Sequence, residues 1–315
     1  MPLYPSSSPL ATHTLDVGHG HTVYVEEGGN PAGIPVVFLH GGPGSGCKPG
    51  HRQFFDPARY RSFLIDQRGA GRSTPFGEIN HNTTQWLIDD LERLRDVAGV
   101  EQWVLFGGSW GAALALAYAE THPERVLGIV LRGSFLARER DLGWFVQDGA
   151  ARLLPVAWAE YSAAVRDIGE TSAALYGAIT GSDRAIAERV ARAWFKWSTE
   201  VVMFPFDQVV GDPPEPLDVL LAKARIELHY AYHRYFLREN QLLEDVHCLP
   251  NVPVHLIHGQ RDLTCTADAS FTLSRAIPGS TLEILRNAGH LSSETPVADA
   301  LVRAADAMAR KIRGD

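Results

Sequence analysis

Residues 103–111 read Trp-Val-Leu-Phe-Gly-Gly-Ser-Trp-Gly. The first four are apolar and predict a short buried strand, and the Ala- and Leu-rich stretch 112–122 predicts a helix after it. Ser109 therefore occupies a Gly-x-Ser-x-Gly motif between a strand and a helix, where glycines permit a tight turn without Cβ clashes. We interpret Ser109 as a nucleophile held on this turn, because a chance match to the motif would lack this context.

A serine hydroxyl is a weak nucleophile until a base takes its proton and a carboxylate orients that base. Asp262 follows the apolar run 254–257, and His290 follows the run 282–285. Both lie in predicted loops beyond strand ends, and the chain order Ser, Asp, His is that of α/β-hydrolases. We therefore predict that Ser109, Asp262 and His290 form a catalytic triad.

The rest of the chain fits a layered α/β fold. Apolar runs that predict strands recur at 36–39, 63–65, 103–106, 126–131, 254–257 and 282–285. Longer amphipathic stretches separate them, which predicts a mostly parallel sheet flanked by helices, including helices at 84–97 and 296–313. An antiparallel hairpin is expected at the sheet edge, within residues 14–25. The prediction is an α/β-hydrolase fold.

A helical cap is expected between residues 135 and 245, because strand-like runs become rare there and helical spacing dominates. The hydrolase core would then comprise residues 1–134 and 246–315. Residues 211–216 (Gly-Asp-Pro-Pro-Glu-Pro) predict a loop within the cap.

A glycine-rich loop, His-Gly-Gly-Pro-Gly at 40–44, follows the predicted strand 36–39. A backbone N–H of Gly41 or Gly42, together with that of Trp110, could hold the oxyanion of a tetrahedral intermediate. The segment 66–73, after the next strand, is expected to have a structural role.

Composition and charge exclude several classes of protein. The chain carries 29 Lys plus Arg against 37 Asp plus Glu, a net charge of −8, which disfavours nucleic acid and acidic membranes as partners. No apolar run approaches the roughly 20 residues of a membrane span. Three dispersed cysteines and no signal-like N-terminus predict a cytoplasmic protein. His229 and His233 have metal-ligand spacing but no third ligand nearby, so we predict no metal.

Several longer motifs resemble one family. They are HGGPGSGC (40–47), DQRGAGRSTP (66–75), GGSWG (107–111), LRGSFLARE (131–139), WFVQDGAARLLP (144–155), ARIELHY (224–230) and HGQRD (258–262). From about residue 14 to the C-terminus, the chain resembles proline iminopeptidases. The resemblance implies removal of N-terminal proline from small peptides, without a cofactor.

The resemblance also implies the residues that bind substrate. Glu227 matches one of the family's glutamates that bind the free amino terminus. Phe135 and Phe145 match aromatic residues that hold the proline ring, and Cys265 matches a cysteine near the substrate pocket.

One position departs from the family's pattern. The second amine-binding glutamate directly follows a Trp, whereas Ser198 follows Trp197 here. Glu200 lies two residues further on, which on a regular helix is a rotation of about 200°. Glu200 could replace the missing carboxylate only if this segment is not a regular helix; otherwise it is a solvated surface residue.

Two other functions stay open from sequence. A serine esterase, amidase or lactonase could use the same triad if amine recognition has been lost with the glutamate. A ligand-binding protein with a vestigial triad is the other alternative. Peptide length preference, oligomeric state and physiological role are not determined by the sequence.

Overall fold

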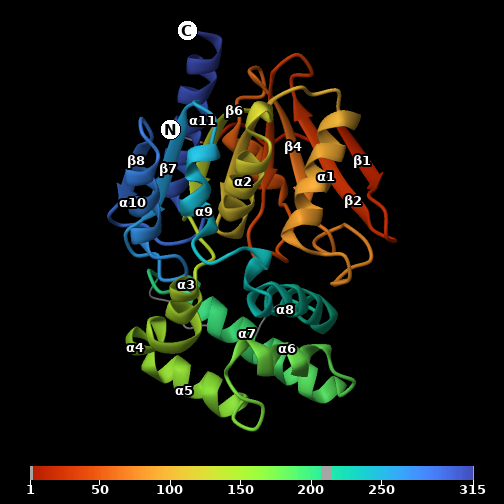
Figure 1. The fold of residues 1–315 in the computed structure, drawn as a ribbon, viewed down its shortest axis with the longest axis vertical. Helices are drawn as coiled ribbons and strands as arrows, with labels where there is room; N and C mark the ends of the chain where they lie inside the picture. Colours follow the sequence, from red (N-terminus) through yellow and green to blue (C-terminus); the bar gives the residue numbers. More distant parts are fainter. Residues whose placement is uncertain (1–2, 207–214, 315) are drawn as a thin grey trace.

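The computed structural model describes residues 3–206 and 215–314, and its core is an eight-stranded sheet (Figure 1). The strand order is β1-β2-β4-β3-β5-β6-β7-β8. Bounds are Ala11–Asp16 (β1), Thr22–Gly29 (β2), Ile34–Leu39 (β3), Tyr60–Asp66 (β4), Trp103–Gly108 (β5), Val126–Arg132 (β6), Val254–Gly259 (β7) and Thr281–Leu285 (β8). β1 pairs antiparallel with β2 and β2 with β4, and all other pairs are parallel. The predicted α/β-hydrolase fold and its edge hairpin are confirmed.

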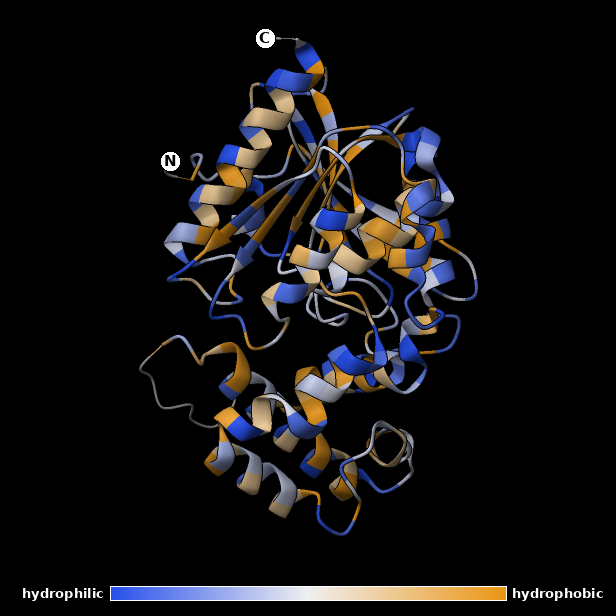
Figure 2. Cartoon of the chain, turned by 60° about the vertical axis from the view of Figure 1, so that its left-hand side comes forward, coloured by the Kyte–Doolittle hydropathy of each residue, from blue (hydrophilic) through white to orange (hydrophobic). Residues whose placement is uncertain are grey.

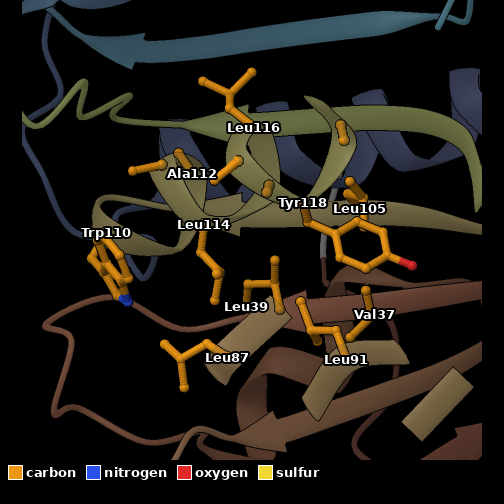
Figure 3. Close-up of a cluster of buried hydrophobic side chains, with 14 of the residues drawn as sticks. Val37, Leu39, Leu87, Leu91, Leu105, Trp110, Ala112, Leu114, Leu116 and Tyr118 are labelled. Atoms are coloured by element: carbon orange, nitrogen blue, oxygen red, sulfur yellow. The ribbon is translucent and has the colours of Figure 1, made fainter. Parts of the chain in front are cut away.

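Helices cover both faces of this sheet. α1 (Thr84–Val97), α2 (Trp110–Thr121) and α10 (Ala267–Ala276) contribute to one apolar cluster, and α11 (Thr295–Arg313) contributes to the other. Alternate residues of β3 point to opposite faces, so Val37 and Leu39 join the α1 and α2 side, whereas Phe38 joins the α11 side. Figure 3 shows Val37 and Leu39 near Leu87 and Leu91 of α1 and Leu114 of α2. This two-sided burial explains why the central strands β3 and β5 are apolar, and orange dominates the middle of the sheet in Figure 2.

Local signals set the ends of these helices. The Thr83 hydroxyl accepts a hydrogen bond from the backbone N–H of Trp86, which caps α1. Pro123 follows the end of α2, and Pro296 occupies the first turn of α11, where a proline costs no hydrogen bond. The expected helices at 84–97 and 296–313 are therefore present, with an additional residue at the start of α11.

Between β6 and β7 the chain forms a helical layer below the carboxyl ends of the strands (Figure 1). Its helices are α3 (Glu139–Gly143), α4 (Ala150–Leu153), α5 (Pro155–Ala164), α6 (Ser172–Thr180), α7 (Arg184–Val202) and α8 (Leu217–Tyr232), with a π-helical turn at Trp144–Asp148. This cap has an apolar cluster of its own, which includes the fully buried Trp197. α9 (Gln241–Glu244) contributes Leu242 to the main core on the α2 side, and α8 contributes Ile226 and Tyr230 to the same cluster. Of the expected loop at 211–216, residues 211–214 lie outside the described residues.

Candidate active site

Ser109 lies on the turn that joins β5 to α2. Its backbone has φ 58° and ψ −125°, a conformation that costs a non-glycine residue about 1–3 kcal/mol and is found mostly at functional sites. The turn is possible because Gly111 has no side chain: a Cβ there would lie 2.0 Å from the carbonyl oxygen of Leu39. Ser109 consequently faces a cavity of about 780 Å³ between the core and the cap.

Asp262 and His290 meet beyond the ends of β7 and β8. Nδ1 of His290 donates to Oδ2 of Asp262 at 2.7 Å, and Oδ1 of Asp262 accepts the backbone N–H groups of Thr264 and Cys265, both at 2.9 Å. Gly133 permits this approach, because a Cβ there would lie 3.2 Å from Oδ2 of Asp262. The carboxylate therefore fixes the orientation and the tautomer of the imidazole, so that Nε2 is the ring nitrogen without a proton.

Burial and mutual contact shift the pKa values of this pair. Burial alone would raise the pKa of Asp262, but the contacts with His290 and His258 outweigh it and hold the pKa well below its usual range. Burial lowers the pKa of His290, and Asp262 opposes that shift only in part. At neutral pH the pair is an ionised carboxylate and a neutral imidazole, which is the state a general base requires.

The loop around His290 is fixed from two sides. The carboxylate of Glu294 accepts the backbone N–H groups of Gly289 and Leu291, at 2.8 and 2.9 Å. Nη1 of Arg132 donates to the backbone oxygen of His290 at 2.6 Å and lies 3.3 Å from its Nε2. Arg132 ends β6, and the sequence reasoning did not identify it.

Ser109 makes no hydrogen bond to His290 in this conformation of the described chain. Its Oγ instead lies 3.9 Å from Sγ of Cys265. Burial raises the pKa of the Cys265 thiol well above its usual value, so this sulfur stays protonated and is not a competing nucleophile. Nucleophile and base often come into contact only when substrate binds.

The backbone N–H groups of Gly41, Gly42 and Trp110 donate no hydrogen bond to other described residues and flank Ser109. The side chain of Gln67 connects the loop that carries Gly41 and Gly42 to Trp110. Its side-chain N–H donates to the carbonyl of His40 at 2.8 Å, and its Oε1 accepts the indole N–H of Trp110 at 2.8 Å. Gln67 thus fixes the loop that begins at His40 relative to Trp110, and it lies within the segment for which a structural role was expected.

The residues implied for substrate binding line the same cavity: Phe135, Phe145, Glu227 and Cys265. Oε2 of Glu227 accepts the indole N–H of Trp194 at 2.7 Å, and the ring of Trp194 lies edge-on to Phe145 with centroids 5.7 Å apart. Burial raises the pKa of Glu227, while the Trp194 hydrogen bond and Lys223 lower it in part. The cap side of the site therefore combines aromatic walls with a partly buried carboxyl group, that of Glu227.

Ser198 and Glu200 do not line this cavity as described. Both lie on α7, which is continuous over Arg184–Val202, so Glu200 points away from the side of the helix that carries Trp194. Ser198 is one turn after Trp194, and its buried hydroxyl has no hydrogen-bond partner among the described residues. Glu170, which precedes α6, does line the cavity and was not found from the sequence.

Within residues 3–206 and 215–314, no group of three or more His, Cys, Asp or Glu side chains is placed to hold a metal ion. His229 and His233 lie with ring centroids 4.9 Å apart, and Nε2 of His229 contacts the backbone oxygen of Asn82 at 3.0 Å. None of the described helices is long and apolar enough to cross a membrane.

Comparison with known proteins assigns a family. The profile of the alpha/beta hydrolase fold matches residues 34–296. A probable proline iminopeptidase of Leptolyngbya boryana is 40% identical over 99% of this chain and 98% of its own length. The proline iminopeptidase of Xylella fastidiosa (strain 9a5c) is 43% identical over 96% of this chain and 98% of its own.

A solved structure shares the fold. The crystal structure of a proline iminopeptidase from Mycobacterium smegmatis superposes with a TM-score of 0.63 at 21% identity, covering 97% of this chain and all of that one. The chain belongs to the proline iminopeptidase family of α/β-hydrolases.

Proposed function

We propose that the protein is a serine aminopeptidase that releases N-terminal proline from small peptides. The observation that carries the proposal is the partly buried carboxyl group of Glu227, which Trp194 holds in the cavity that Ser109 also lines. A partly buried carboxylate favours a cationic partner, and the secondary ammonium of an N-terminal proline supplies one. Phe135, Phe145 and Trp194 provide apolar walls against which a pyrrolidine ring can pack.

The reaction follows from the positions of the polar groups. His290 takes the proton of Ser109 through Nε2 as Oγ attacks the prolyl carbonyl, and the oxyanion receives the N–H groups of Trp110 and of Gly41 or Gly42. His290 then donates that proton to the leaving amine, which breaks the peptide bond and leaves a prolyl ester on Ser109. Water, deprotonated by His290, hydrolyses this ester. Asp262 stabilises the imidazolium in both halves of the reaction.

Recognition of the amine limits cleavage to the first residue. The ammonium can reach Glu227 only if no residue precedes proline, because an acylated nitrogen carries no charge. Charge-assisted hydrogen bonds contribute about 1.5–3 kcal/mol, so a blocked substrate should react at least about tenfold more slowly.

The test compares three substrates of the purified protein: prolyl arylamide, N-acetylprolyl arylamide and a small uncharged aryl ester. The proposal expects efficient cleavage of the first, poor cleavage of the second and a Ser109-dependent rate on the third. Equal rates on the free and acetylated prolyl substrates would contradict it.

The second candidate is a serine esterase that accepts uncharged acyl groups, and it is favoured by one observation. Ser198 occupies the position where the resemblance implies a second amine-binding glutamate. Glu227 is then the one carboxylate of that pair, and the binding of an ammonium is weaker. The same panel decides between the two functions, since an esterase would prefer the uncharged ester and ignore the amine.

The proposal includes the cellular compartment, which we take to be the cytoplasm. The three cysteines, Cys47, Cys248 and Cys265, are all free thiols. This state supports a reducing compartment such as the cytoplasm, where small peptides are available as substrates.

A further inference from the structure

We propose that Asn82 is a positioning residue for recognition of the substrate amine, because it fixes helix α8, which carries Glu227, at a set distance from Ser109. Asn82 acts through this helix and touches no substrate. The inference rests on the proposed prolyl aminopeptidase activity. It gives the core of the fold control over the specificity of a residue in the cap.

Helix α8 presents three different sides to its surroundings. Ile226 and Tyr230, four residues apart, belong to the main apolar cluster of the core. A second side contributes three residues to the apolar cluster of the cap: Leu220, Ala224 and Leu228. Glu227 lies between these two sides and lines the cavity. α8 therefore joins the core to the cap (Figure 1), and its place on the core decides where Glu227 stands relative to Ser109.

The first half of α8 lies directly against two glycines of the core. A Cβ at Gly44, in the loop after β3, would lie 3.2 Å from Cα of Lys223. A Cβ at Gly77 would lie 2.8 Å from Cβ of Ala222. These contacts set how closely α8 approaches the core. Apolar contacts have no preferred direction, so the rotation and the axial position of α8 depend on other groups.

Asn82 supplies directional contacts at the other end of α8. It is 1% exposed and lies in the loop before α1. Its Nδ2 donates to the backbone oxygens of Arg68 and Glu78, both at 2.9 Å, which anchors the amide to the core. Its Oδ1 accepts the hydroxyl of Tyr230 at 2.9 Å, and its backbone oxygen accepts the Nε2–H of His229 at 3.0 Å. One core residue thus holds two consecutive residues of α8.

Packed helices connect this loop to the nucleophile. The residue after Asn82 caps α1, and α1 shares the main apolar cluster with α2, which begins directly after Ser109. The ring of Tyr230 also contacts that of Trp110, with centroids 5.0 Å apart. Glu227 precedes Tyr230 by three residues, less than one helical turn. A shift of α8 therefore moves the carboxylate of Glu227 relative to Ser109.

Amine recognition is the step that such a shift would impair. Charge-assisted hydrogen bonds depend on distance and direction, and a displacement of about 1 Å can cost on the order of 100-fold in rate. None of the three triad residues stands on α8. Loosening of α8 should therefore slow prolyl substrates more than an uncharged ester.

The experiment measures kcat/KM for prolyl arylamide and for the small uncharged aryl ester in Asn82→Ala and Tyr230→Phe. The second variant removes one hydroxyl and keeps the ring against Trp110. We expect kcat/KM for prolyl arylamide to fall at least about tenfold in Asn82→Ala and about threefold in Tyr230→Phe, while the value for the ester changes less than about twofold.

Tyr60→Phe is the matched control for the loss of a buried hydroxyl. The hydroxyl of Tyr60 donates to the backbone oxygen of Ala305 at 2.6 Å, in the apolar cluster on the α11 side of the sheet. This variant loses a buried hydrogen bond of the same kind but leaves α8 in place, so it should keep the wild-type ratio of the two kcat/KM values.

A double variant separates positioning from a general loss of structure. In a Glu227→Gln background the carboxylate to be positioned is absent, so Asn82→Ala should lower kcat/KM for prolyl arylamide no more than for the ester. The inference is overturned if the effects of the two substitutions on prolyl arylamide are additive. An unchanged ratio in Tyr230→Phe also overturns it, even if Asn82→Ala does not fold.

Failure of the proposed function is visible in the wild-type protein alone. Equal rates on free and N-acetylated prolyl arylamide would show that the amine is not recognised, and both the function and the role of Asn82 would be wrong. If the wild-type protein prefers the free amine but the two variants lower prolyl and ester rates equally, only the role of Asn82 is wrong.

Discussion

The indole nitrogen of Trp194 lies 2.7 Å from Oε2 of Glu227 and links α7 to α8 at the wall of the cavity. The indole is a donor only, so it favours the ionised carboxyl group and fixes its orientation. One carboxylate oxygen is thereby engaged, and Oε1 has no described hydrogen bond. This arrangement presents a single fixed acceptor to a substrate cation.

Glu227→Gln should lower kcat/KM for prolyl arylamide by at least about tenfold, because a charge-assisted hydrogen bond is replaced by a neutral one. The rate on an uncharged aryl ester should barely change, since the triad is intact. Glu188→Gln, at an exposed position on α7, is the control. Equal losses on both substrates would make Glu227 a structural residue.

The pH dependence of the two substrates should differ on the acid side. Burial raises the pKa of Glu227, and only its ionised form attracts an ammonium, so amine binding is lost as the pH falls through that raised value. The ester needs only neutral His290, whose pKa is lowered by burial. The acid side of the kcat/KM profile should therefore depend on both Glu227 and His290 for the prolyl substrate, and on His290 alone for the ester. An acid limb of the prolyl substrate that is unchanged in Glu227→Gln would contradict the role of Glu227.

Substitution of any residue of the predicted triad should abolish or severely reduce turnover without unfolding the protein. Ser109→Ala and His290→Ala should each lower kcat by several orders of magnitude, with unchanged circular dichroism. Asp262→Asn should also be severe, because an amide can stabilise the wrong imidazole tautomer and cannot balance the imidazolium. Substantial turnover in any of the three variants would show that the nucleophile or its base lies elsewhere.

Ser198→Glu tests whether the cap can regain a second carboxylate. Residues four apart on a helix lie on the same side, so a glutamate at 198 would be one turn from Trp194 and near Glu227. If the protein keeps its fold, kcat/KM for prolyl arylamide should rise several-fold while ester hydrolysis does not. Ser198→Gln has the same size without the charge and should give no such rise.

Local patterns predicted the parts of the fold that local physics determines. Apolar runs predicted the parallel strands, and the apolar stripe of residues 84–97 predicted α1, because burial of two sheet faces or of one helix face leaves its trace in the local sequence. The Gly-x-Ser-x-Gly turn is likewise predicted from consecutive residues. Its strained backbone at Ser109 follows from residues immediately around it.

The contacts that complete the site depend on distant residues and left no local trace. Arg132 and His290 are 158 residues apart, and Gln67 reaches Trp110 across 43 residues. Arg132 ends β6 and Gln67 follows β4. Side chains at the carboxyl ends of parallel strands converge, so these two residues could have been named as candidates. Which atom each contacts depends on side-chain direction and strand register, which the pattern does not contain.

The last prediction concerns stability and a carboxyl group that catalysis does not use. Both oxygens of Glu120, near the end of α2, are buried without a hydrogen-bond partner, and burial together with Asp245 raises its pKa to about 8. A carboxyl group whose pKa is higher in the folded than in the unfolded state binds its proton more tightly when folded. Its contribution to the free energy of unfolding is therefore lost as the pH rises from its ordinary value to about 8.

Glu120→Gln removes this ionisation and should stabilise the protein at pH 9 by about 1–3 kcal/mol, with little effect at pH 5. Denaturant unfolding at both pH values measures the difference. Glu92→Gln is the opposing control, because the hydrogen bonds from Arg95 and Tyr118 outweigh burial and lower the pKa of Glu92, so its loss should destabilise the protein at pH 9. A pH-independent effect of Glu120→Gln would mean that this carboxyl group is hydrated in solution and ionises at its ordinary pKa.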